Sequence, residues 1–262
     1  LMTEGSIFQK ILFFSIPLIL GNLLQQLYNT ADSVMVGNFV GSNALAAVGA
    51  SSSMIYLLIA FSQGAAVGAG VIVAQYLGAK DKKSVSDAVH TSLVIAGILG
   101  IVLTIAGIVL SRQLLEWMKT PEEVMEQAVT YFRLYSAGMF FGIVYNMAAG
   151  ILNAAGNSKR SLLYLAVASF TNIILDILFI AILDMGVAGA AIATDISQAV
   201  SCILSMAFLM RVKDSYQVSL KKLKIHRRIA GSMIRVGLPT GIQNMVISLS
   251  NVLVQTSVNG FG

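Results

Sequence analysis

Long apolar runs separated by short polar segments dominate the hydrophobic pattern of the chain. Six of the runs match or exceed the roughly 20 apolar residues that a helix needs to cross a bilayer. These runs cover residues 11–37, 45–77, 88–110, 124–150, 161–183 and 187–210, and a seventh begins near residue 236. The pattern therefore predicts an all-α integral membrane protein with six membrane-spanning helices and the start of a seventh.

The composition favours a membrane protein over a soluble one. Apolar residues make up 56% of the chain and charged residues only 11%, whereas a soluble domain has about 25% charged residues. The sequence lacks the Gly-x-x-x-x-Gly-Lys-Ser/Thr loop of ATP-driven proteins. His90 and His226 have no ligand-spaced partners, so no metal site is expected apart from a site for a coupling ion. We expect neither an enzyme nor a cofactor.

The positive charges are distributed unevenly between the predicted loops. With the N-terminus placed in the cytoplasm, 14 of the 17 Lys and Arg residues fall on the cytoplasmic side. This distribution is what the positive-inside rule requires. The basic segment 211–228 then follows the sixth helix on the cytoplasmic side, where anionic lipid headgroups are the expected neighbours and nucleic acid is not. We expect a multi-pass plasma membrane protein, of the bacterial inner membrane.

Turn residues separate the predicted helices. Gly78 and Gly156 stand where helices should end. Thr120 precedes Pro121, with a Glu three residues after the Thr, which is typical of a helix that begins with a capping Thr and a first-turn Pro.

A weak repeat relates the first and seventh apolar runs. Residues 11–40 resemble residues 233–262 at a fixed offset of 222. Six positions are identical, pairing Pro17 with Pro239, Asn22 with Asn244, Leu27 with Leu249, Asn29 with Asn251, Val36 with Val258 and Phe39 with Phe261. Parallel repeats of six helices are a known transporter plan. We therefore expect a six-helix lobe at 1–210, a basic cytoplasmic linker at 211–232 and a truncated first helix of a second lobe at 233–262.

Polar side chains recur at helical spacing inside the spans. In the first span Asn22, Gln25, Asn29 and Asp32 follow at steps of three and four, which places them on one helix face. Other predicted polar faces hold Asn146 and Asn153 in the fourth span, Asn172 and Asp176 in the fifth, and Thr194 and Gln198 in the sixth, with Asp195 beside them. Such faces either join helices by hydrogen bonds or line a wet cavity. For the intramembrane acids we favour function, because a lone charge in hydrocarbon is costly.

Three of these residues share one predicted depth. Asp32, Asp176 and Thr194 each lie seven or eight residues from an outer loop, or roughly 10–12 Å at 1.5 Å per residue. Carboxylate and hydroxyl oxygens suit Na⁺, and a buried carboxylate suits H⁺. The sequence thus predicts a cation or proton site in the outer half of the bundle.

Several ordered segments resemble the multidrug and toxic compound extrusion (MATE) family. They are 15–17 (SIP), 27–37 (LYNTADSVMVG), 44–49 (ALAAVG), 76–81 (YLGAKD), 172–176 (NIILD) and 186–194 (GVAGAAIAT). The resemblance implies two six-helix lobes, alternating access, and export of amphiphilic organic cations in exchange for H⁺ or Na⁺. It implies a cation site at Asp32, Asn172, Asp176 and Thr194, with Gln25 linked to the same pocket and Pro17 at a bend of the first helix. The sequence departs from the family pattern at Ile177, where Pro is common, and at Asp195, which is usually apolar.

Two other functions compete with an exporter. A flippase for lipid-linked oligosaccharide or peptidoglycan precursors would need cationic residues around its cavity, whereas the spans here carry acids. An intramembrane aspartyl protease also uses two aspartates, but the Gly-x-Gly-Asp segment that such a family resemblance would require is absent.

We also expect Asn29, Asn146, Asn153, Asp195 and Gln198 to line the substrate cavity or support the cation site.

Overall fold

The computed structural model describes the backbone of residues 7–259 and the side-chain surroundings of residues 15–258. Its helices are α1 (Ile7–Phe39), α2 (Ser42–Gly78), α3 (Lys82–Trp117), α4 (Glu122–Ala154), α5 (Ser158–Asp176), the π-helix η1 (Ile177–Ile182), α6 (Gly186–Arg211), the short 3₁₀-helix η2 (Leu220–Lys222) and α7 (Arg227–Asn259). Phe261, which the repeat pairs with Phe39, lies outside the described residues.

The helical architecture predicted from the apolar runs is confirmed. Each predicted run falls within one helix, except the fifth, which extends over α5 and η1 and ends one residue beyond η1. Within the part of the chain that the structure describes, five helical segments are long and apolar enough to cross a membrane: α2, α3, α4, α5 with η1, and α6. The helices α1 and α7, of 33 residues each, lie outside that set of five.

The predicted helix boundaries agree with the structure at two positions and differ at one. The helix α2 ends at Gly78, and Gly156 follows α4 with a φ of +78°, which glycine adopts at no steric cost. Thr120, however, does not cap α4. The N-cap position is Pro121, and the Thr120 hydroxyl has no hydrogen-bond partner among the described residues. Pro121 adopts an extended conformation, which places Thr120 one residue too far from the helix for its hydroxyl to reach the exposed N–H groups.

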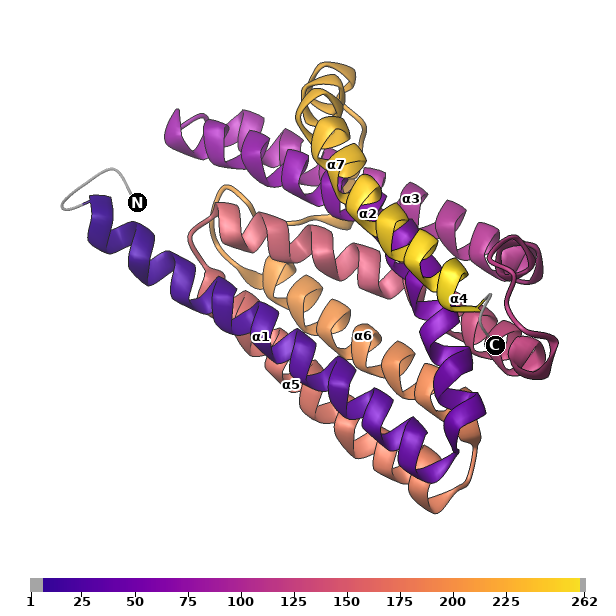
Figure 1. Cartoon of the computed structure of the whole chain (residues 1–262). Helices are drawn as coiled ribbons and strands as arrows, with labels where there is room; N and C mark the ends of the chain where they lie inside the picture. The colour runs from indigo at the N-terminus through magenta and orange to yellow at the C-terminus, as the bar shows by residue number, and fades with distance from the viewer. Residues whose placement is uncertain (1–6, 260–262) are drawn as a thin grey trace.

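The helices form two groups that meet at α4 (Figure 1). The helices α1, α5 and α6 lie side by side, while α2 and α3 pack against the opposite flank of α4. The helix α4 also contacts α6, so it joins the two groups. Interhelical hydrogen bonds are sparse and specific, as in the bond from the Ser51 hydroxyl on α2 to the Ala128 carbonyl on α4 at 3.1 Å.

Paired glycines bring α7 against α2 (Figure 1). Gly64 and Gly68 on α2 face Gly237 and Gly241 on α7, and both pairs have the spacing Gly-x-x-x-Gly. A Cβ atom added to Gly68 would lie 2.7 Å from the backbone nitrogen of Gly237. Only glycine permits such a close approach of two backbones, which is a common way of packing membrane helices. The helix α7 is thus fixed to the first six helices through α2.

Candidate functional site

The polar face of α1 points into the interior of the bundle from Gln25 onward, whereas Asn22, predicted to share that face, is exposed and lines neither cavity. Gln25, Tyr28 and Asn29 line one cavity, and Asn29 and Asp32 line a second. Asn29 belongs to both because it lies between them, and its side-chain amide donates a hydrogen bond to the Tyr56 hydroxyl of α2 at 3.1 Å. The spacing of three and four residues along α1 therefore places the amides and the acid on the cavity side.

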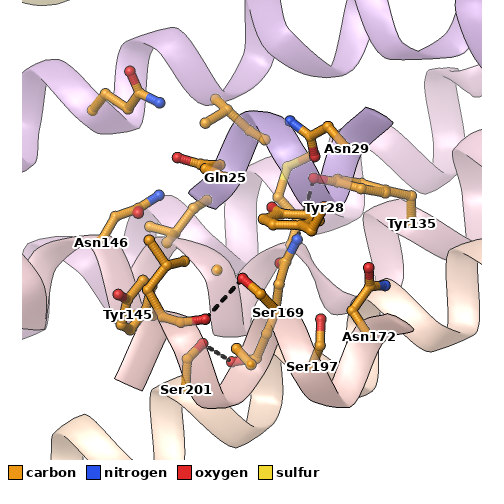
Figure 2. A pocket seen from close by; sticks show the side chains of 18 of the residues that line it. Gln25, Tyr28, Asn29, Tyr135, Tyr145, Asn146, Ser169, Asn172, Ser197 and Ser201 are labelled. Carbon is orange, nitrogen blue, oxygen red and sulfur yellow. Dashed lines mark hydrogen bonds between the residues drawn. The ribbon is translucent and has the colours of Figure 1, made fainter. Parts of the chain in front are cut away.

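The first cavity has a volume of about 90 Å³ and lies between α1, α2, α4, α5 and α6. Figure 2 shows the polar side chains that converge on it from α1, α4, α5 and α6. Its polar lining consists of Gln25, Tyr28, Asn29, Tyr56, Gln63, Tyr135, Tyr145, Asn146, Ser169, Asn172, Ser197, Gln198 and Ser201. None of the described lining residues is charged. The lining thus combines aromatic rings with neutral hydrogen-bonding groups.

The second cavity, of about 230 Å³, contains the α1 acid. Asp32 and Thr194 line it together with Tyr56, Tyr131 and Tyr135, and Asp32 is the one carboxylate among the described lining residues. Asn29, Tyr56 and Tyr135 line both cavities, so the two spaces share a wall. Asp32 itself is 7% exposed, and its Oδ1 atom has no hydrogen-bond partner within the described residues.

A hydrogen bond joins α5 to α6 beside the cavities. The Asn172 side-chain nitrogen donates to the Thr194 hydroxyl at 3.4 Å, and this hydroxyl donates in turn to the Ala190 carbonyl at 3.1 Å. The amide oxygen of Asn172 is buried and unpartnered among the residues described. Two of the predicted cation-site residues therefore touch each other.

Asp176 lies one helical turn beyond Asn172 and is completely buried. Neither carboxylate oxygen has a hydrogen-bond partner in the described part of the chain. Asp176 does not line either cavity. The helix widens from α to π geometry at the next residue, Ile177, where the sequence departs from the family pattern. Local π geometry in helices is frequent at functional sites.

The remaining predicted residues are dispersed. Asn146 and Gln198 line the first cavity, and the Gln198 amide donates to the Tyr135 hydroxyl at 3.2 Å. Asn153 does not line either cavity, and its amide oxygen is buried without a partner in the described chain. Asp195 packs directly against Gly138 of α4, away from both cavity linings. Pro17 is buried inside α1, which continues through it without a break.

Sequence reasoning missed the tyrosines. Four tyrosines surround the acid and the amides: Tyr28, Tyr56, Tyr131 and Tyr135. The apolar fraction of the sequence includes tyrosine, so the hydrophobic pattern does not set these residues apart. Their spacing carried a signal, because Tyr28 stands three residues after Gln25 and four before Asp32, on the same helix face. On α4, Tyr131 and Tyr135 are likewise four residues apart, and their rings lie 6.0 Å from each other.

The donor set fits a small cation or a proton. Among the four predicted cation-site residues, the unpartnered oxygens belong to the carboxylates of Asp32 and Asp176 and the amide of Asn172, which are acceptors of the kind that Na⁺ and H⁺ require. Asp195 Oδ1 and Asn153 Oδ1 are also buried without a partner among the described residues, outside both cavity linings. No group of three or more His, Cys, Asp or Glu side chains suited to a metal ion occurs among the described residues.

A bundle of long apolar helices around buried polar cavities is the architecture of a multi-pass membrane protein. A family model described as MatE matches residues 17–178, and the chain belongs to that family. This confirms the family predicted from the sequence segments.

Two bacterial relatives agree with this family assignment. The probable multidrug resistance protein YpnP of Bacillus subtilis is 32% identical over 99% of this chain and 58% of its own length. The multidrug export protein MepA of Staphylococcus aureus (strain MRSA252) is 23% identical over 99% of this chain and 57% of its own. The chain thus spans a little over half the length of these relatives.

Solved structures share the fold. A multidrug resistance MATE family transporter of the MOP superfamily, in an outward-facing conformation, superposes with a TM-score of 0.87 and 33% identity. The match covers 94% of this chain and 54% of that one. A MATE structure in a bent conformation gives the same TM-score and identity over 94% of this chain and 55% of its own.

Proposed function

We propose that this chain forms the first lobe, and the first helix of the second lobe, of a cation-coupled exporter of amphiphilic organic cations. Residues 1–210 would form the first lobe, 211–232 the cytoplasmic linker and 233–262 the start of the second lobe. The N-terminus would lie in the cytoplasm and the protein in the bacterial inner membrane. No cofactor would be needed other than H⁺ or Na⁺ as the coupling ion.

The observation that carries the proposal is the set of buried oxygens without partners at Asp32, Asn172 and Asp176. Burying an unpaired carboxylate costs several kcal/mol. A bound H⁺ or Na⁺ removes that cost, so these oxygens favour a site that takes up an ion. Asp32 reaches a cavity while Asp176 is fully enclosed, which gives Asp32 the role of first contact with the entering ion.

The cavities suit an organic cation. Tyrosine faces attract cations, by roughly 0.5–2 kcal/mol per contact, and the amides of Gln25, Asn146 and Gln198 offer hydrogen bonds without competing charge. A negative Asp32 at the shared wall would attract the same cation. Neutralisation of Asp32 by the coupling ion would weaken this attraction and release the substrate to the outside.

The other candidate functions receive less support from the site. The described linings of both cavities lack Lys and Arg, and a flippase for pyrophosphate-linked precursors would need such residues. An intramembrane protease would need two aspartates that share one open site, whereas Asp176 is enclosed.

Ion-driven transport in liposomes tests the proposal. The full-length protein is reconstituted, an H⁺ or Na⁺ gradient is imposed, and movement of ethidium is followed for wild type and Asp32→Asn. We expect the variant to lose ion-driven transport at least about tenfold, the effect of about 1.4 kcal/mol of lost ion affinity. Asp184→Asn, in the exposed outer turn between η1 and α6, is the matched control and should transport normally. Normal transport by Asp32→Asn would remove this acid from the mechanism.

A further inference from the structure

The segment between α6 and α7 is fastened to the helices at several points. The Val218 backbone N–H donates to the Leu209 carbonyl of α6 at 2.8 Å, and the Asn157 amide of the α4–α5 turn donates to the Tyr216 hydroxyl at 2.9 Å. Val218 and Tyr216 are both buried. The first half of the segment therefore has a fixed position on the bundle.

Two side chains of α3 hold the second half. The Ser219 backbone N–H donates to His90 Nε2 at 3.0 Å, and the His226 backbone N–H donates to the Thr91 hydroxyl at 3.2 Å. His90 Nδ1 lies 2.6 Å from the Ser86 carbonyl, so this nitrogen carries the proton and Nε2 is free to accept. The stretch 220–225 is thus held at both ends against one site on α3.

All six residues between these two contacts are exposed. Three of them are large and apolar: Leu220 is 61% exposed, Leu223 40% and Ile225 41%. The other three are Lys221, Lys222 and Lys224. Apolar side chains interleaved with lysines and facing outward are the pattern of a segment that lies in a membrane interface.

The depth of the contacts on α3 agrees with that position. The helix α3 has 36 residues, or about 54 Å at 1.5 Å per residue, against a hydrocarbon core of about 30 Å. An excess of roughly 12 Å therefore projects from each end. His90 is the ninth residue of α3, roughly 12 Å from its start. Lys, Arg, Asp and Glu are absent between Asp87 and Arg112. His90 thus lies close to the boundary between headgroups and hydrocarbon.

We propose that residues 220–225 form an interfacial anchor, in which Leu220, Leu223 and Ile225 enter the cytoplasmic leaflet while Lys221, Lys222 and Lys224 bind the phosphates of anionic lipids. The proposal rests on the cytoplasmic placement of the linker under the proposed function. The charge of the stretch complements anionic headgroups. The anchor would hold the connection between the lobes at a fixed depth while the cavities change access.

Depth measurement by spin labelling tests the anchor. Cys202 is the one cysteine among these 262 residues, so a single label is placed at Leu223→Cys after Cys202, and any cysteine elsewhere in the full-length protein, has been replaced by Ser. The full-length protein is reconstituted in vesicles of phosphatidylcholine with about one-third phosphatidylglycerol, since anionic lipid supplies the attraction. We expect the label to be accessible to oxygen and shielded from a water-soluble nickel complex. A label at Lys213→Cys, on the exposed start of the linker, should show the reverse.

The outcomes separate lipid from other neighbours. Equal nickel accessibility of the two labels would overturn the anchor, and so would a Leu223 label shielded from both reagents, which would place protein over it. Replacing Lys221, Lys222 and Lys224 together by Gln should move the Leu223 label outward. It should also abolish any dependence of the label's depth on the phosphatidylglycerol content of the vesicles. An unchanged depth in that variant would overturn the role of the lysines. The measurement needs no transport, so its failure is distinct from failure of the exporter proposal.

Discussion

The side-chain amide of Asn172 on α5 donates to the hydroxyl of Thr194 on α6 across 3.4 Å. The same amide presents its oxygen, without a partner among the described residues, on the helix face that it shares with Asp176. One contact thus fixes the orientation of the amide and leaves its acceptor free for an ion. Thr194 also lines the cavity that contains Asp32, so this pair connects the enclosed acid with the accessible one.

Removing the Thr194 hydroxyl should weaken ion binding. We expect Thr194→Val to raise the ion concentration for half-maximal transport by about 2- to 10-fold, because a hydrogen bond between neutral groups contributes about 0.5–1.5 kcal/mol. Thr194→Ser keeps the hydroxyl and should stay close to wild type. The measurement is the H⁺ or Na⁺ dependence of substrate transport in liposomes. Equal behaviour of the Val and Ser variants would show that the hydroxyl has no part in the site.

A substitution at Gly142 should disturb the first cavity through Gln198. A Cβ atom at Gly142 would contact the Gln198 amide oxygen and lie 3.1 Å from its Cδ atom, which would displace the amide from the Tyr135 hydroxyl. We expect Gly142→Ala to weaken ethidium binding. In a Gln198→Ala background, Gly142→Ala should reduce the free energy of ethidium binding by a smaller amount. The coupling energy between the two substitutions should be about 0.5–3 kcal/mol. Fluorescence titration of the four proteins measures this cycle, and additive effects would contradict the contact.

The α2–α7 crossing should tolerate no side chain at Gly68. We expect Gly68→Leu to lower the melting temperature in detergent, because an overpacked site costs roughly 1–3 kcal/mol and here the obstacle is the α7 backbone. Gly97→Ala on α3 is the matched control, since its Cβ would meet no atom within 4 Å. A melting temperature for Gly68→Leu equal to that of Gly97→Ala would show that the two backbones do not meet there.

The positions of the helices could be predicted from the sequence because apolar runs and turn glycines act locally. The cavity side of α1 was also predictable, since the spacing of Gln25, Asn29 and Asp32 defines a face. The sequence does not predict which helices pack against each other, because periodicity indicates which face of a helix is buried and not which helix covers it. For this reason the sequence predicts neither the contact of Asp195 with Gly138 nor the packing of α7 on α2. The apolar pattern also gives no signal for the change to π geometry after Asp176.

The cap of α3 should respond to pH. Asp81 accepts hydrogen bonds from the Ser84 hydroxyl and backbone N–H at 2.6 and 3.1 Å, which lowers the pKa of Asp81 below its ordinary value. A lowered pKa in the folded state means that the stabilisation is present above the unfolded pKa, about 4, and is lost as the pH falls through the lowered value. Asp81→Ala should therefore reduce amide-exchange protection in the first turn of α3 at pH 7. Below the lowered pKa the variant and wild type should converge, and a difference that persists there would contradict the assignment.

Ion release on substrate binding tests the shared use of Asp32 and Asp176 most directly. Ethidium is added to the purified full-length protein in weakly buffered detergent, and released protons, or displaced radioactive Na⁺, are counted. Competition between ion and substrate predicts release from wild type and none from Asp32→Asn or Asp176→Asn, with Asp184→Asn releasing as wild type does. Undiminished release from both of the first two variants would contradict the proposal that these carboxylates hold the coupling ion.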